Sequence, residues 1–122
     1  MLDLAHKNLN VWQKSLEFVS SIYKLTQTFP REEQFGITSQ LRRASVSVIS
    51  NIAEGFARTS KIETRRFLEI ARSSLVEVDT QIEISITLKY LTEKEIKNLK
   101  ENSNHIFAML TNLIKNFQNK FK

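Results

Sequence analysis

The sequence contains no cysteine, which excludes disulfide bonds, zinc knuckles and thiol nucleophiles together. Glycine and proline are nearly as scarce, because Gly36, Gly55 and Pro30 are the only ones among 122 residues. A sheet protein of this length would need a turn signal about every 8 to 12 residues. The scarcity therefore predicts helices joined by few turns. The lack of cysteine also favours a reducing compartment, which we take to be the cytoplasm.

Long apolar runs are absent as well. No stretch approaches the roughly 18 uncharged residues of a membrane span, and the N-terminus has no apolar segment typical of a secretory signal. A chain of 122 residues is long enough for one domain with a real core. We expect a single domain over residues 1–122, with no membrane association and no cofactor, and we identify no small-molecule substrate.

Four segments repeat apolar residues at three- and four-residue steps, the period of an amphipathic helix. Breaks fall at Phe29-Pro30, at Thr59-Ser60 and at Thr92. Links this short make successive helices run in opposite directions. The pattern predicts an all-α fold, an antiparallel up-down-up-down four-helix bundle, with helices at about residues 8–28, 38–57, 61–91 and 93–118.

The first helix carries two apolar stripes. The stripe that we expect to face the core holds Leu9, Trp12, Leu16, Val19 and Tyr23. The residues that we assign to a contact between subunits are Val11, Trp12, Phe18 and Ile22. Together they make an apolar arc wider than one neighbouring helix covers. We therefore expect the chain to assemble with copies of itself.

The second helix has a polar seam beside its apolar one. A solvent-facing side is the simpler interpretation, but such sides commonly use lysine and glutamate, whereas this seam uses serine, amides and arginine. These residue types suit a packed polar contact with the third helix. We predict a structural polar network made of Gln40, Arg42, Arg43, Ser47, Asn51, Glu54, Ser74 and Glu77.

The partners in this network follow from folding the second and third helices back about Thr59. Residues whose numbers add to about 119 then lie level, to within one helical turn. This places Arg42 beside Glu77 and Glu54 beside Arg65, and we predict an ion pair at each level. If such a pair is buried, removing the glutamate charge would cost roughly 3 kcal/mol.

The run from Gln40 to Gly55 resembles the second-helix signature of a known family. Val11-Trp12-Gln13, the link from Phe29 to Gly36 and the run from Phe67 to Glu77 are similar to the same pattern, although Ser73 stands where glycine is expected. The family is that of the bacterial four-helix bundle proteins encoded in intervening sequences of 23S ribosomal RNA genes.

This resemblance covers about residues 9–91. It implies a bundle that assembles into a homo-oligomeric ring, a pentamer. It also implies a distant similarity to the pentameric accessory protein of diversity-generating retroelements, which binds nucleic acid and reverse transcriptase.

No catalytic or metal-binding motif is found in the sequence. It has no glycine-rich phosphate loop, no paired-histidine zinc helix and no nucleophile elbow. His6 lies in what we take to be a mobile N-terminal tail, and His105 follows Glu101 by four residues, which makes only a lone pair of possible ligands. We predict that the protein is not an enzyme and binds no metal.

A basic group surrounds the turn between the second and third helices. The candidate nucleic-acid-binding residues are Arg58, Lys61, Arg65, Arg66 and Arg72. The net charge of +5 favours polyanions, although solubility alone would also explain it. Repeating the group around a ring would multiply weak phosphate contacts. We therefore expect RNA or DNA as the ligand, with RNA favoured.

The role of the C-terminal residues and the choice between two functions stay open. A second basic group ends the chain and consists of Lys115, Lys120 and Lys122 with Phe117 and Phe121. The alternative function is that of a protein–protein interaction adaptor that contacts no nucleic acid.

Overall fold

The computed structural model describes residues 1–118, which form four α-helices and two short 3-10 helices. The α-helices are α1 (Asn10–Thr26), α2 (Ile37–Ala57), α3 (Lys61–Thr87) and α4 (Lys97–Asn116), and the 3-10 helices are η1 (Ala5–Asn8) and η2 (Arg31–Glu33). No strand occurs within residues 1–118, so the predicted all-α class is confirmed. None of the helices described is long and apolar enough to cross a membrane.

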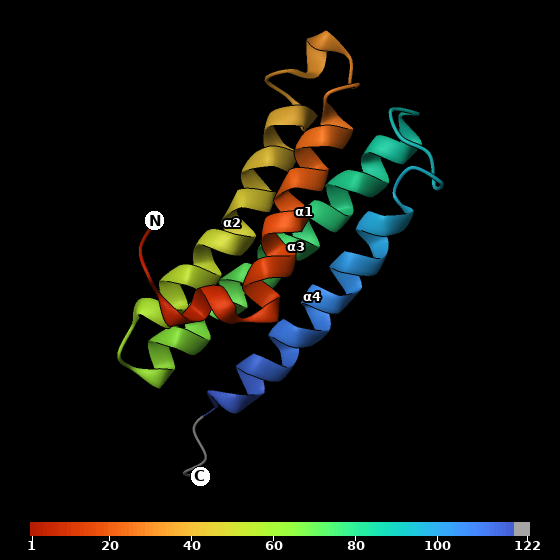
Figure 1. Cartoon of the computed structure of the whole chain (residues 1–122). Helices are drawn as coiled ribbons and strands as arrows, with labels where there is room; N and C mark the ends of the chain where they lie inside the picture. Colours follow the sequence, from red (N-terminus) through yellow and green to blue (C-terminus); the bar gives the residue numbers. More distant parts are fainter. Residues whose placement is uncertain (119–122) are drawn as a thin grey trace.

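The four helices enclose one core. α1 and α3 each pack against both α2 and α4 and make little contact with each other, so they lie at opposite corners of the bundle (Figure 1). Every helix contributes side chains to the core centre. The largest fully buried apolar side chains are Phe18, Ile22, Leu41, Val48, Ile52, Leu68, Val78, Ile106 and Leu110.

The two apolar stripes of α1 are exchanged relative to the prediction. Val11, Phe18 and Ile22, which were assigned to a contact between subunits, are only 3%, 0% and 0% exposed within their own chain. That assignment is wrong, because a side chain enclosed by its own core cannot also contact another copy. Leu16 and Tyr23 were predicted to face inward, yet they are 47% and 40% exposed.

Two hydroxyl residues explain why α1 is rotated in this way. Ser15 and Thr26 lie on the buried stripe, where Ser15 Oγ donates to Val11 O at 2.6 Å and Thr26 Oγ1 donates to Ile22 O at 2.7 Å. Each side chain satisfies its hydroxyl on its own helix and can therefore be buried at little cost. A pattern that counts serine and threonine as polar misses this face.

The turn between α2 and α3 brings the two helices very close together. Thr64 Oγ1 donates to Gly55 O at 2.9 Å, and a Cβ on Gly55 would lie only 3.2 Å from both Thr64 O and Phe67 Cβ. Ser60 caps α3 by accepting from Glu63 N at 3.4 Å. Position 55 therefore has little room for a side chain, which accounts for glycine inside a helix despite its low helical propensity.

The link between α3 and α4 is longer than predicted. α3 ends at Thr87 rather than near residue 91, and Lys89 adopts a left-handed φ of 66° that prevents the helix from continuing. A capping box forms at the predicted break, since Thr92 N donates to Glu95 Oε1 at 2.9 Å and Glu95 N donates to Thr92 Oγ1 at 3.3 Å. However, it closes a turn before α4, which begins only at Lys97.

The α1–α2 and α3–α4 links meet at one end of the molecule (Figure 1). Tyr90 Oη donates to Glu33 Oε2 at 2.8 Å, and the Tyr90 ring packs against Phe29 with 5.4 Å between centroids. The hydrogen bond to Glu33, followed by burial and the negative charges of Glu33 and Glu32, raises the pKa of Tyr90 above its usual 10.0. This contact joins the two halves of the chain.

The prediction of a mobile N-terminal tail around His6 is wrong. His6 belongs to η1 and is buried, and its ring meets the Trp12 ring edge-on at 5.7 Å between centroids. The Gln13 side chain also donates to Lys7 O at 3.2 Å. These two contacts hold the segment against the start of α1.

Candidate functional site

The centre of the predicted polar network lies between α2 and α3. Ser47 Oγ and Ser74 Oγ are 2.8 Å apart, and Asn51 Nδ2 donates to Ser47 O at 2.8 Å and to Ser47 Oγ at 3.0 Å. Ser74 is buried, and Ser47 and Asn51 are half-buried. The Ser47–Ser74 and Gly55–Thr64 hydrogen bonds agree with the predicted level of the two helices to within one turn.

The predicted ion pair between Arg42 and Glu77 does not form. Arg42 instead turns toward α1, where its Nε donates to Thr26 Oγ1 at 2.9 Å and its guanidinium lies 4.6 Å from the centroid of the Tyr23 ring. Glu77 is exposed, and within residues 1–118 its carboxylate accepts only a long hydrogen bond, 3.4 Å, from Gln81 on its own helix. The prediction failed because residue numbers show only which positions of α2 and α3 lie at the same height. They do not show whether a side chain of α2 faces α1 or α3.

The predicted pair between Glu54 and Arg65 is also absent. Glu54 pairs with Arg58 at 3.1 Å, and Arg65 pairs with Glu69 at 3.7 Å. In each pair the two residues are four apart in sequence and lie on the same exposed side of their helix. The two side chains are therefore neighbours already and lose little conformational freedom when they pair. These pairs are worth well under about 1 kcal/mol, because solvent screens them.

Gln40 and Arg43 remain exposed at the edge of the network. Together with Ala44, Ser47 and Glu77 they line a shallow hollow of about 410 Å³. The structure thus brings three of the eight predicted residues into direct contact and leaves Gln40, Arg43 and Glu77 at the rim.

The predicted nucleic-acid-binding residues do not form one open basic surface. Arg58 lies 4.8 Å from the Phe67 ring centroid, pairs with Glu54 and approaches Glu63 at 3.9 Å. Arg72 turns toward α4 and donates to Thr111 Oγ1 at 3.2 Å.

Two of the predicted nucleic-acid-binding residues, Lys61 and Arg66, have side chains that are accessible to a ligand. Both are exposed, and neither forms an ion pair among residues 1–118. Arg66 lines a second shallow hollow, of about 320 Å³, beside Glu69 and Ser73.

The second basic group is only partly described. Lys115 is exposed on α4, and the Phe117 ring packs edge-on against Phe56 with 6.0 Å between centroids. Lys120, Phe121 and Lys122 lie outside the described residues.

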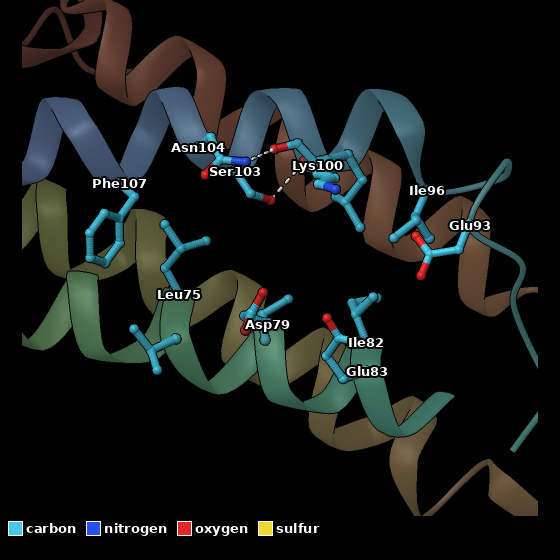
Figure 2. A pocket seen from close by; sticks show the side chains of 13 residues that line it. Leu75, Asp79, Ile82, Glu83, Glu93, Ile96, Lys100, Ser103, Asn104 and Phe107 are labelled. Carbon is cyan, nitrogen blue, oxygen red and sulfur yellow. Dashed lines mark hydrogen bonds between the residues drawn. The ribbon is translucent and has the colours of Figure 1, made fainter. Parts of the chain in front are cut away.

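A groove between α3 and α4 was not predicted. It has a volume of about 440 Å³, and Figure 2 shows apolar side chains along its walls and acidic side chains from its middle to one end. The labelled acidic residues are Asp79, Glu83 and Glu93. One sequence signal was available, because Asp79 and Glu83 are like charges four residues apart, which is unfavourable on an isolated helix.

Two exposed apolar surfaces lie on α1 and α3. The first combines Leu16 and Tyr23 of α1 with Val46 of α2. The second occupies an arc of about 120° on the outer side of α3 and consists of Ile62, Ile70, Val76 and Ile84. We call these the α1 surface and the α3 surface.

The model of the 23S rRNA-intervening sequence protein family matches residues 7–112. The chain belongs to this family. The family resemblance predicted from the residues is thus confirmed, and the match continues past residue 91 into α4 of this 23S rRNA-intervening sequence protein.

A crystal structure supports the same assignment. It shows a protein of unknown function from the S23 ribosomal protein family of Bacteroides thetaiotaomicron, with 28% sequence identity and a TM-score of 0.77. The similarity covers 86% of this 23S rRNA-intervening sequence protein and 98% of that chain. No curated protein matches the present chain.

The structure was also searched for metal ligands. Within residues 1–118, no group of three or more histidine, aspartate or glutamate residues is placed to hold a metal ion.

Proposed function

We propose that this protein is a non-enzymatic scaffold in which antiparallel four-helix bundles assemble into a homo-oligomeric ring that binds nucleic acid, with RNA favoured. The observation that supports the ring is the pair of exposed apolar surfaces on α1 and α3. A ring is built from head-to-tail contacts, in which one surface of each copy meets a different surface of the next. Five copies are what the family resemblance implies.

The positions of the two surfaces fit such a contact. α1 and α3 lie at opposite corners of the bundle, so two neighbours can bind without competing for space. Ile62 is 71% exposed, and the bundle leaves it without a partner among residues 1–118. Of the four residues first assigned to the contact, Trp12 alone is half-buried next to the α1 surface.

The antiparallel arrangement within each bundle has its own support. The Ser47–Ser74 and Gly55–Thr64 hydrogen bonds fold α3 back along α2. The Tyr90–Glu33 hydrogen bond joins the two remaining links at the other end. Both observations agree with an up-down-up-down chain path.

Support for nucleic acid comes from charge. The chain carries a net charge of +5, and Lys61 and Arg66 are exposed near the start of α3. A ring would repeat these two cations in every copy, and each neutralised phosphate adds favourable counterion release. Two weak contacts for each subunit would thereby become a strong combined site.

Assembly can be tested by charging each surface separately. We expect the wild type to have the mass of an oligomer in light scattering, and both Leu16→Glu and the double variant Ile70→Glu/Ile84→Glu to be monomers, because a buried glutamate without a partner is very costly. Phe35→Glu is the control, since Phe35 is 90% exposed in the link before α2 and belongs to neither surface. It should keep the wild-type mass.

Mixing the two monomeric variants distinguishes a head-to-tail contact from a symmetric one. Each variant keeps one intact surface, so the mixture should form pairs with twice the monomer mass and no closed ring. A wild type that is monomeric at every concentration would refute the assembly. A mixture that stays monomeric would show that the α1 surface does not meet the α3 surface.

Nucleic-acid binding is tested by titration with structured RNA and duplex DNA at two salt concentrations. We expect binding at low salt that weakens as the salt concentration rises. For the double variant Lys61→Gln/Arg66→Gln, the slope of log affinity against log salt concentration should fall by an amount that corresponds to about two phosphate contacts. Lys24→Gln/Arg31→Gln removes the same charge elsewhere and should bind more like the wild type. Absence of binding at low salt would leave the protein-interaction adaptor, which the groove between α3 and α4 favours.

A further inference from the structure

The groove between α3 and α4 has the dimensions of a binding site. Its apolar walls come from both helices and from the link before α4, and its volume of about 440 Å³ falls in the usual range of ligand pockets. In Figure 2, Leu75 and Phe107 lie near one end, and Ile82 and Ile96 lie toward the other. Phe107 is 42% exposed, so its ring offers apolar surface to an occupant.

The rim of the groove is acidic in an otherwise basic protein. Asp79, Glu83 and Glu93 contribute three carboxylates against the single ammonium of Lys100. All four side chains are exposed, and none forms an ion pair among the residues that the structure describes. The charge of the lining residues is therefore opposite in sign to the net charge of +5, which favours cationic groups over phosphate groups at this rim.

The remaining polar side chains of the groove need no ligand. Ser103 Oγ donates to Leu99 O at 2.7 Å, and Asn104 Nδ2 donates to Lys100 O at 2.9 Å, both within α4 (Figure 2). The two features that an occupant must match are thus an apolar floor and a carboxylate rim. A bare cation would leave the floor in water, so the occupant must be amphipathic.

The length of the groove indicates how large the occupant is. The wall along α4 runs from Ile96 to Phe107, which corresponds to about 16 Å, or about three helical turns. An amphipathic helix of that length presents three apolar side chains on one face and flanks them with polar residues. Lysine or arginine at the flanks would meet the carboxylates of the rim.

We propose that the groove between α3 and α4 binds a basic amphipathic helix of a partner protein. Apolar side chains at steps of three and four residues lie on the floor, and lysines or arginines pair with Asp79, Glu83 and Glu93. The helix is oriented by charge as well, because Glu83 and Glu93 lie at one end and favour the positive N-terminal end of a helix dipole. This site shares Val76 with the α3 surface, but it uses neither the α1 surface nor the exposed cations of the proposed RNA site.

The test uses the full chain and a defined probe. A fluorescein-labelled peptide of about 14 leucine and lysine residues, long enough to form a helix, carries leucines at i, i+3, i+4 and i+7. A matched peptide replaces every lysine with glutamate. Fluorescence anisotropy should show binding of the lysine peptide and much weaker binding of the glutamate peptide, although the net charges of protein and lysine peptide repel each other.

Two sets of variants locate the binding. Glu83→Lys/Glu93→Lys should lower the affinity for the lysine peptide by at least about tenfold and should raise the affinity for the glutamate peptide. Glu17→Lys/Glu101→Lys makes the same change of charge outside the groove and should bind the lysine peptide nearly as the wild type does. Phe107→Ala should also weaken binding, whereas Phe35→Ala should not.

Several results would overturn the proposal. They are absence of binding, equal affinity of the wild type for both peptides, and equal affinity of Glu83→Lys/Glu93→Lys and wild type for the lysine peptide. A fall in solution mass of Glu83→Lys/Glu93→Lys would instead assign the groove to a contact between copies. Asp79→Asn is a milder variant with little risk to folding, and it should also lower the affinity for the lysine peptide.

Discussion

Replacement of Phe18 with alanine is expected to lower the free energy of unfolding by roughly 3–5 kcal/mol. Phe18 is 0% exposed near the middle of α1, and its ring belongs to the common core. Alanine would remove the apolar contact area of the ring and leave a cavity that the surrounding helices can close only in part. Domains of this kind are stable by about 5–15 kcal/mol, so denaturant unfolding followed by circular dichroism should show a large loss.

Phe35→Ala provides the matched control for this measurement. The same atoms are removed, but Phe35 is 90% exposed, so we expect a change within about 0.5 kcal/mol. The comparison decides which stripe of α1 faces the core. Equal effects of the two substitutions would show that Phe18 is not enclosed by its own chain.

The second large effect is expected at Gly55. Valine at this position should destabilise the protein by roughly 1–3 kcal/mol, because its Cβ would lie 3.2 Å from Thr64 O and from Phe67 Cβ. Both neighbours are fixed by the path of α3, so α2 and α3 would have to move apart. That movement would also lengthen the 2.9 Å hydrogen bond from Thr64 to the Gly55 carbonyl.

Ala57→Val is the control for crowding, since Ala57 is exposed at the end of the same helix. It should change thermal stability only slightly. Gly55→Ala should fall between wild type and Gly55→Val, because alanine gains about 1 kcal/mol of helical propensity over glycine. A Gly55→Val protein that melts at or above the wild-type temperature would contradict the close approach of the helices.

The fold was predictable from the sequence wherever a local signal decided it. The scarcity of glycine and proline and the three- and four-residue apolar steps gave four helices, and α2 was predicted to within one residue at its start. The face of α1 was not predictable in the same way. Two apolar stripes competed, and the buried one contained Ser15 and Thr26, whose hydroxyls bond to their own helix.

The candidate site was predictable only in part, because side-chain pairing depends on which neighbour a helix turns to. Ser47, Asn51 and Ser74 were recognised from their small polar side chains on facing helices. Arg42 lay at the predicted level but contacts α1. The repulsion between Asp79 and Glu83 was readable from the sequence, but the groove itself could not be derived, since it depends on the spacing of α3 and α4 and on the long link that precedes α4.

The tight contact at Gly55 has a consequence for the order in which the chain folds. Gly55 and Thr64 are close in sequence, so the contact between them closes a very short loop and loses little chain entropy. By contrast, the contact of Asn102 with Lys14 O requires α1 and α4 to meet across a separation of 88 residues. Folds nucleate preferentially through contacts of small sequence separation. We therefore expect α2 and α3 to form the folding nucleus, against which α1 and α4 dock later.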